Sequence, residues 1–109
     1  MSENNLHIVL VTGPSVEDAR EIASAILQAR VAACVNIIPG LESHYWWDGE
    51  LKQDPEVLLL IKTTEAKLKE LQKVVLENHP YDTPEFVAFP ASVVADKYMA
   101  WVRDSVKSA

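Results

Sequence analysis

The sequence predicts a mixed α/β domain in which a four-stranded antiparallel sheet carries two helices on one face. Two observations support this fold class. Apolar segments rich in β-branched residues alternate with segments whose apolar residues recur every three to four positions. Asp48-Gly49, a strong hairpin signal, separates two long strand-like segments. The 109 residues fit a single domain that spans positions 1–109.

The first part of the chain predicts a strand followed by a helix. Residues 6–12 are nearly all apolar, which is typical of a strand buried on both faces. Ser15 is suited to cap the next helix, with Asp18 as its capping-box partner. The helix is expected over residues 16–30, because its apolar residues fall on one face. This apolar stripe consists of Ala19, Ile22, Ala23, Ile26 and Leu27.

The middle of the chain predicts a long hairpin arm. A strand over residues 32–38 is interrupted by Pro39-Gly40, which we interpret as a bulge, since proline lacks a ladder donor and glycine tolerates unusual φ values. The strand resumes over residues 41–47, and after the Asp-Gly turn the chain returns over residues 51–63. Such an arm is unusually long for so small a chain.

The last third predicts a helix, a short strand and a final helix. Thr64 is expected to cap a helix that begins at Glu65 and ends before Pro80. A strand is expected over residues 85–89 and a helix over residues 96–106. The resulting order, β-α-β-β-α-β-α, is that of the ferredoxin-like, split βαβ sandwich.

One face of the expected sheet has no cover. The first two strands are apolar on both sides, but the main helices lie on one face only. No further element of the chain is left to form a second layer. We therefore expect the chain to self-associate, with the exposed edges of the arm joining the subunits.

Charge and composition disfavour several functional classes. The net charge of −6 disfavours a nucleic-acid partner, and the longest apolar run, residues 57–61, is far shorter than a membrane span. A single cysteine excludes an internal disulfide, and the polar N-terminus does not resemble a signal peptide, so we expect a cytoplasmic protein without a membrane partner. The nucleophile elbow, the P-loop and the zinc-protease motif are missing, so we expect no enzyme and no organic cofactor.

Three sets of residues are candidate metal ligands. His79 and Glu85 flank a turn-rich segment and predict a site for copper or another divalent metal, unless His79 merely ends a helix and Glu85 pairs with a base. Glu42 and His44 share one face of a strand and form either a second, weaker site or an ordinary surface pair. Cys34 is either a soft ligand or, as we favour, a small hydrophobe of the core.

Three consecutive aromatic residues, Tyr45, Trp46 and Trp47, precede the tip of the arm. In a strand they point to alternating faces, so both sides of the arm carry aromatic surface. We expect them to be buried at an interface between subunits. A base-stacking role is disfavoured by the net charge.

Four blocks in matching order resemble the CutA family of divalent-ion tolerance proteins. They are residues 29–40 (ARVAACVNIIPG, similar to K/R-L-A-A-C-x-N-x-x-P), 45–50 (YWWDGE, an aromatic hairpin tip), 56–64 (EVLLLIKTT, a strand) and 79–85 (HPYDTPE, similar to H-P-Y-x-x-P-E). Tyr98 and Trp101 stand where the family's final helix has aromatic residues. The likeness extends over nearly the whole chain, from about residue 9 to residue 106.

The resemblance implies properties that spacing alone does not. Family members are very stable homotrimers with interlocked hairpin arms, are linked to tolerance of divalent metals, copper especially, and have no established reaction. Their trimer is similar to that of the PII signalling proteins. Some members carry a cysteine in the first strand as a candidate copper ligand, but this chain has Val11 there.

The leading hypothesis is therefore a homotrimeric copper or divalent-metal tolerance protein that binds without catalysis. Its ligand clefts are expected between subunits near Tyr45, Lys62, Glu85 and Trp101. One alternative is a PII-like signalling module that binds a small anionic metabolite through Lys62 and Arg103. Another is a structural or assembly partner for other proteins.

Overall fold

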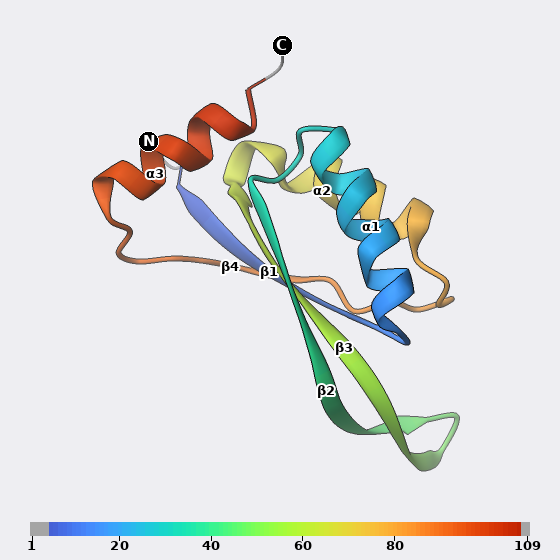
Figure 1. Ribbon diagram of the computed structural model, residues 1–109. Helices are drawn as coiled ribbons and strands as arrows, with labels where there is room; N and C mark the ends of the chain where they lie inside the picture. The colour runs from blue at the N-terminus through green and yellow to red at the C-terminus, as the bar shows by residue number, and fades with distance from the viewer. Residues whose placement is uncertain (1–4, 108–109) are drawn as a thin grey trace.

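A computed structural model of the chain describes residues 5–107. The strands form one antiparallel sheet in the order β2-β3-β1-β4, and α1 and α2 lie on the same side of it (Figure 1), which confirms the predicted architecture. Within residues 5–107, no helix combines the length and apolarity needed to cross a membrane. The elements are β1 (Leu6–Gly13), α1 (Val16–Gln28), β2 (Cys34–Trp47), β3 (Glu50–Thr64), the 3-10 turn η2 (Glu65–Lys67), α2 (Leu68–Asn78), β4 (Val87–Pro90) and α3 (Asp96–Ser105).

The core lies between the two main helices and one face of the sheet. Val9 and Val11 of β1 stand beside Ile61 and Leu59 of β3, and all four are fully buried. The helices contribute Ile22, Ile26, Leu71 and Val75, which are fully buried as well. Burying each side chain of this size contributes about 1.5–3 kcal/mol, so this cluster supplies most of the drive for folding within one chain.

The ends of α1 follow local chemistry. The Ser15 hydroxyl accepts a hydrogen bond from the Asp18 backbone N–H at 3.1 Å, which confirms the predicted cap. The helix ends at Gln28 rather than at Arg30, because Arg30 has a φ of 61° in the left-handed region that terminates helices. The Arg30 guanidinium then donates to the Ser105 carbonyl oxygen at 3.0 Å and joins this corner to α3.

Two further predictions differ from the structure. The helical segment begins at Glu65 as predicted, but as the 3-10 turn η2, and the buried Thr64 side chain before it makes no capping hydrogen bond. The last strand begins at Val87 rather than at Glu85. Continuing the pairing of β4 with β1 would place Glu85 opposite Thr12, but the Thr12 carbonyl oxygen accepts a hydrogen bond from His79 Nε2 instead.

The predicted arm is present and projects from the body of the molecule (Figure 1). The pairing of β2 with β3 shifts between Ile38 and Leu41, and Gly40 has a φ of 89°, so the bulge at Pro39-Gly40 is confirmed. Asp48 and Gly49 both have positive φ, at 52° and 76°, as a type I′ hairpin turn requires.

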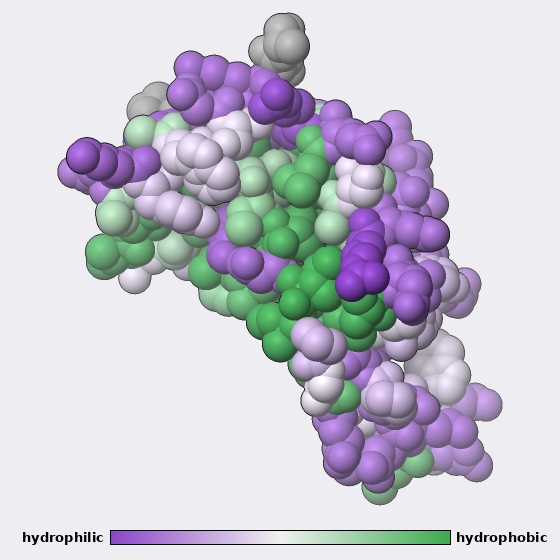
Figure 2. Space-filling model, in the orientation of Figure 1, coloured by the Kyte–Doolittle hydropathy of each residue, from purple (hydrophilic) through white to green (hydrophobic). Residues whose placement is uncertain are grey.

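The sheet face opposite α1 and α2 is only partly covered. Its α3 end packs Met99 and Val102 against Leu6. Beyond α3, hydrophobic side chains remain open: Val87 of β4 is 50% exposed and Ile38 of β2 is 41% exposed. Figure 2 shows hydrophobic residues gathered over the middle of the sheet, between α3 and the arm. Within one described chain, the second layer that the sequence requires is therefore incomplete.

Candidate functional site

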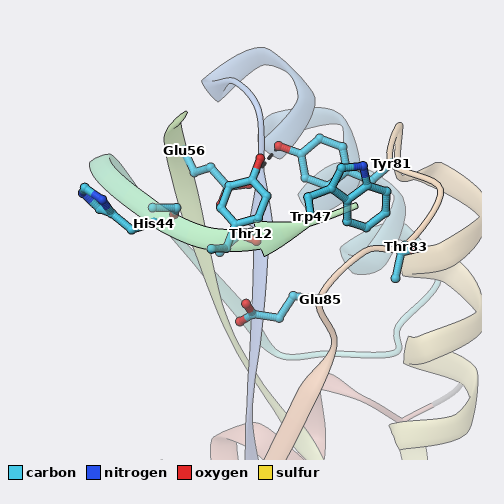
Figure 3. A pocket seen from close by; sticks show the side chains of 9 residues that line it. Thr12, His44, Trp47, Glu56, Tyr81, Thr83 and Glu85 are labelled. Carbon is cyan, nitrogen blue, oxygen red and sulfur yellow. Dashed lines mark hydrogen bonds between the residues drawn. The ribbon is translucent and has the colours of Figure 1, made fainter. Parts of the chain in front are cut away.

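A pocket of about 480 Å³ lies where the arm leaves the sheet (Figure 3). It is built from the end of β1, the last residues of β2 before the hairpin turn, Glu56 of β3 and the loop that connects α2 to β4. Its size is within the range of small-molecule sites. The lining residues are Thr12, Ser43, His44, Tyr45, Trp47, Glu56, Tyr81, Thr83 and Glu85.

His79 holds the loop that forms one wall of this pocket. Its Nε2 lies 2.7 Å from the Thr12 carbonyl oxygen, which can only accept, so this nitrogen carries the proton. Its Nδ1 accepts from the Tyr81 backbone N–H at 3.1 Å. Both ring nitrogens are therefore engaged within the chain. It also packs on the Tyr81 ring, with 4.8 Å between the ring centroids.

Two tyrosine hydroxyls tie the aromatic walls to carboxylates. The Tyr81 hydroxyl donates to Glu56 Oε2 at 2.8 Å, and the Tyr45 hydroxyl donates to Asp54. Burial, together with the bond to Glu56, raises the pKa of Tyr81, and the bond to Asp54 raises the pKa of Tyr45. Both phenols stay protonated at neutral pH and hold their rings in fixed positions.

Glu85 supplies the second carboxylate of the pocket. Figure 3 shows it on the opposite side from Trp47 and Tyr81. Partial burial, and then the negative charge of Glu56, raise the pKa of the Glu85 carboxyl above its ordinary value. The described lining contains neither lysine nor arginine. The pocket thus combines aromatic walls with two carboxylates that repel each other.

This repulsion predicts a pH-dependent effect of Glu85→Gln. Because the folded chain holds the Glu85 proton more tightly than the unfolded chain, ionised Glu85 lowers stability as the pH rises through its raised pKa. We expect Glu85→Gln to raise the melting temperature at pH 7 by on the order of 1–2 °C, since solvent screens the partly exposed group. The gain should vanish well below pH 4.5, the ordinary value of this carboxyl, where both states are protonated.

Thermal unfolding of the two proteins between pH 3 and pH 8 checks this expectation. Glu77→Gln, on the exposed side of α2, is the control because it makes the same change in net charge. An equal gain in both variants would assign the effect to net charge rather than to the pocket.

The structure brings together half of the predicted ligand cleft. Tyr45 and Glu85 line the same pocket, whereas Lys62 and Trp101 do not. The Lys62 ammonium donates to the Asn36 side-chain oxygen on the open sheet face. The Trp101 ring lies against Tyr98 on α3, with 5.5 Å between the ring centroids.

The predicted metal ligands have other partners within the chain. Among residues 5–107, no three His, Cys, Asp or Glu side chains are grouped so as to hold a metal ion. His44 Nε2 contacts Glu42 Oε2 at 2.7 Å, so this pair does share a face, but both side chains are exposed. His79 would have to give up a hydrogen bond to bind a metal. The metal site at His79 and Glu85 stays a prediction.

Cys34 does not lie in the helix-covered core, contrary to the interpretation we favoured. It begins β2, is half-buried and stands opposite Lys62 across the sheet. Its thiol lies 3.7 Å from the Asn36 side-chain oxygen. The period of two explains the error, because Val35 and Ile37, which alternate with Cys34 and Asn36, are the residues that pack on the core.

The chain matches a known family and known structures. The family described as CutA1 divalent ion tolerance protein matches residues 7–105. The divalent-cation tolerance protein CutA of Thermus thermophilus is 48% identical over 98 residues, which cover 90% of this chain and 95% of that protein. The chloroplastic protein CutA of Arabidopsis thaliana is 44% identical over 101 residues, which cover 93% of this chain. The chain spans only 56% of that relative's length.

Solved structures agree with this assignment. The crystal structure of CutA1 from Oryza sativa is 40% identical and superposes with a TM-score of 0.93, covering 100% of both chains. The Thermus thermophilus structure is 47% identical, with a TM-score of 0.89 over 92% of this chain and 97% of the other. The protein therefore belongs to the CutA1 family of divalent ion tolerance proteins.

Proposed function

We propose that this protein is a homotrimer that takes part in divalent-cation tolerance by binding metal ions, copper among them, without catalysing a reaction. The observation that carries the proposal is the pair of carboxylates, Glu56 and Glu85, in one pocket whose described lining has no basic counter-charge. Burial and the negative charge of Glu56 together raise the pKa of Glu85, and a cation entering the pocket would offset both effects. The family's link to divalent cations supports the same conclusion.

The open sheet face and the arm support the trimer. The face around Val87 and Ile38 carries hydrophobic side chains that a single chain leaves half-exposed. Trp46 and Leu51 on the arm are 70% and 69% exposed. Such surfaces mark protein interfaces, and copies of the same chain are the commonest occupants. A protein of this kind would act as an assembly rather than as single chains.

One chain alone offers too few donors to bind a metal ion tightly. Glu56 and Glu85 offer carboxylate oxygens, and His44 at the rim offers an imidazole. Transition metals need three or more donors, so a complete site requires water or donors from a second copy. An anionic metabolite is disfavoured in this pocket, because both carboxylates would repel it.

The test is a calorimetric titration of metal-stripped protein with Cu(II) and Zn(II). We expect Glu85→Gln to weaken binding about tenfold or more, since charged ligands contribute at least 1.4 kcal/mol each. Glu77→Gln is the charge-matched control on α2 and should bind as the unmodified protein does. His79→Ala removes the two hydrogen bonds that hold the loop, so we expect it to weaken metal binding only indirectly. The melting temperature of this variant measures how far the structure is loosened. Binding that is indifferent to Glu85→Gln would contradict the assignment of this pocket.

A further inference from the structure

We propose that the pocket also binds an organic ammonium group, held by the ring faces of Trp47, Tyr81 and Tyr45 and by the carboxylates Glu56 and Glu85. The ligand class is a small compound with an alkylated ammonium head. This inference goes beyond the proposed function, since a small metal ion uses oxygen and nitrogen donors and gains little from three aromatic rings. The two ligand classes can therefore be separated by experiment.

The aromatic rings are the first argument. A cation within about 6 Å of a ring centroid is attracted by the negative ring face, and groups of such rings recognise alkylated ammonium ions. Trp47 and Tyr81 lie together on one side of the pocket (Figure 3), and Tyr45 joins them in the lining. Trp47 is 51% exposed and Tyr81 is 37% exposed in the described chain, so within one chain the two rings are open to a ligand.

The second argument is that two of the rings are fixed in place before any ligand binds. Glu56 holds the Tyr81 hydroxyl and Asp54 holds the Tyr45 hydroxyl. The His79 ring packs at a tilt against Tyr81 and supports it from the loop side. A site whose side chains are already ordered loses less conformational entropy when a ligand binds. Its affinity for the ligand is therefore higher than that of a site that has to become ordered.

Charge and size complete the argument. Glu85 lies across the pocket from Trp47 and Tyr81, so a cation between them would meet ring faces on one side and a carboxylate on the other (Figure 3). The volume of about 480 Å³ exceeds what a bare metal ion requires. Room for a methylated head and an attached chain remains in the pocket.

The experiment titrates the unmodified protein with tetramethylammonium at constant ionic strength, followed by calorimetry. The ligand control is 3,3-dimethylbutan-1-ol, a soluble neutral alcohol whose tert-butyl group has nearly the shape of the cation. We expect saturable binding of the cation only. Trp47→Leu should weaken binding about fivefold or more, within the range of a cation–π contact. Trp101→Leu, which changes a 48% exposed ring on α3 outside the pocket lining, should leave affinity unchanged.

Further variants keep the outcomes distinct. Tyr81→Phe keeps the ring but loses its hydrogen bond to Glu56, so it should weaken ammonium binding less than Trp47→Leu does. Glu85→Gln should weaken both ammonium and metal binding. Native mass of each variant shows whether its assembly is intact. Absence of saturable ammonium binding, or equal binding in Trp47→Leu, overturns this inference even if metals bind. Ammonium binding without metal binding would instead overturn the proposed metal function and leave this inference standing.

Discussion

A Val87→Glu variant is expected to sediment as a single chain of 12.2 kDa, whereas the unmodified protein is expected to sediment as an assembly. Val87 is 50% exposed on the open face of the sheet, so in an isolated chain the substitution should change stability by no more than about 0.5 kcal/mol. In an assembly that covers this face, the carboxylate would be buried without a partner. That costs several kcal/mol, enough to prevent association.

The matched control is Leu76→Glu. Leu76 is 46% exposed, like Val87, but it belongs to α2 on the opposite side of the sheet. It should leave the assembly intact. If both variants stay assembled at the same concentration, the open face is not the contact between subunits.

Leu59→Ala is expected to lower the free energy of unfolding by about 2–5 kcal/mol. Leu59 is fully buried on β3, in the centre of the core between the sheet and the main helices. Removing its branched end leaves a cavity that the surrounding strands and helices fill only in part. Denaturant titration at one protein concentration measures the change, because the stability of an assembly depends on concentration. Leu76→Ala, at a 46% exposed position of α2, is the control and should change stability far less.

Local chemistry made most of the fold predictable. The Ser15 cap, the bulge at Pro39-Gly40 and the Asp48-Gly49 turn each rest on residues adjacent in sequence, and all three are present. The alternation of apolar residues identified the strands, and the order of the elements then determined the sheet. These features need no knowledge of distant contacts.

The boundaries that failed depend on such contacts. The start of β4 moved because the imidazole of His79 takes the carbonyl oxygen of Thr12, 67 residues away. Thr64 stands between β3 and η2 with its side chain buried, so tertiary packing overrode its preference for a cap. Neither outcome is encoded in the neighbouring residues.

The candidate site was only half predictable. Tyr45 and Glu85 were expected near a ligand, but Glu56 and Tyr81 were not. Their hydrogen bond spans 25 positions and depends on how the loop after α2 returns to the base of the arm. Counting back from the Asp-Gly turn places Glu56 opposite Leu41, before the bulge shifts the register, but it gives no information on the loop that carries Tyr81.

We propose above all that the open sheet face and the arm join copies of this chain. Sedimentation velocity of the unmodified protein, diluted from micromolar concentration downward in the absence of metal, tests it most directly. We expect one species with three times the 12.2 kDa of a single chain, persisting on dilution. A single species of 12.2 kDa at micromolar concentration would contradict it.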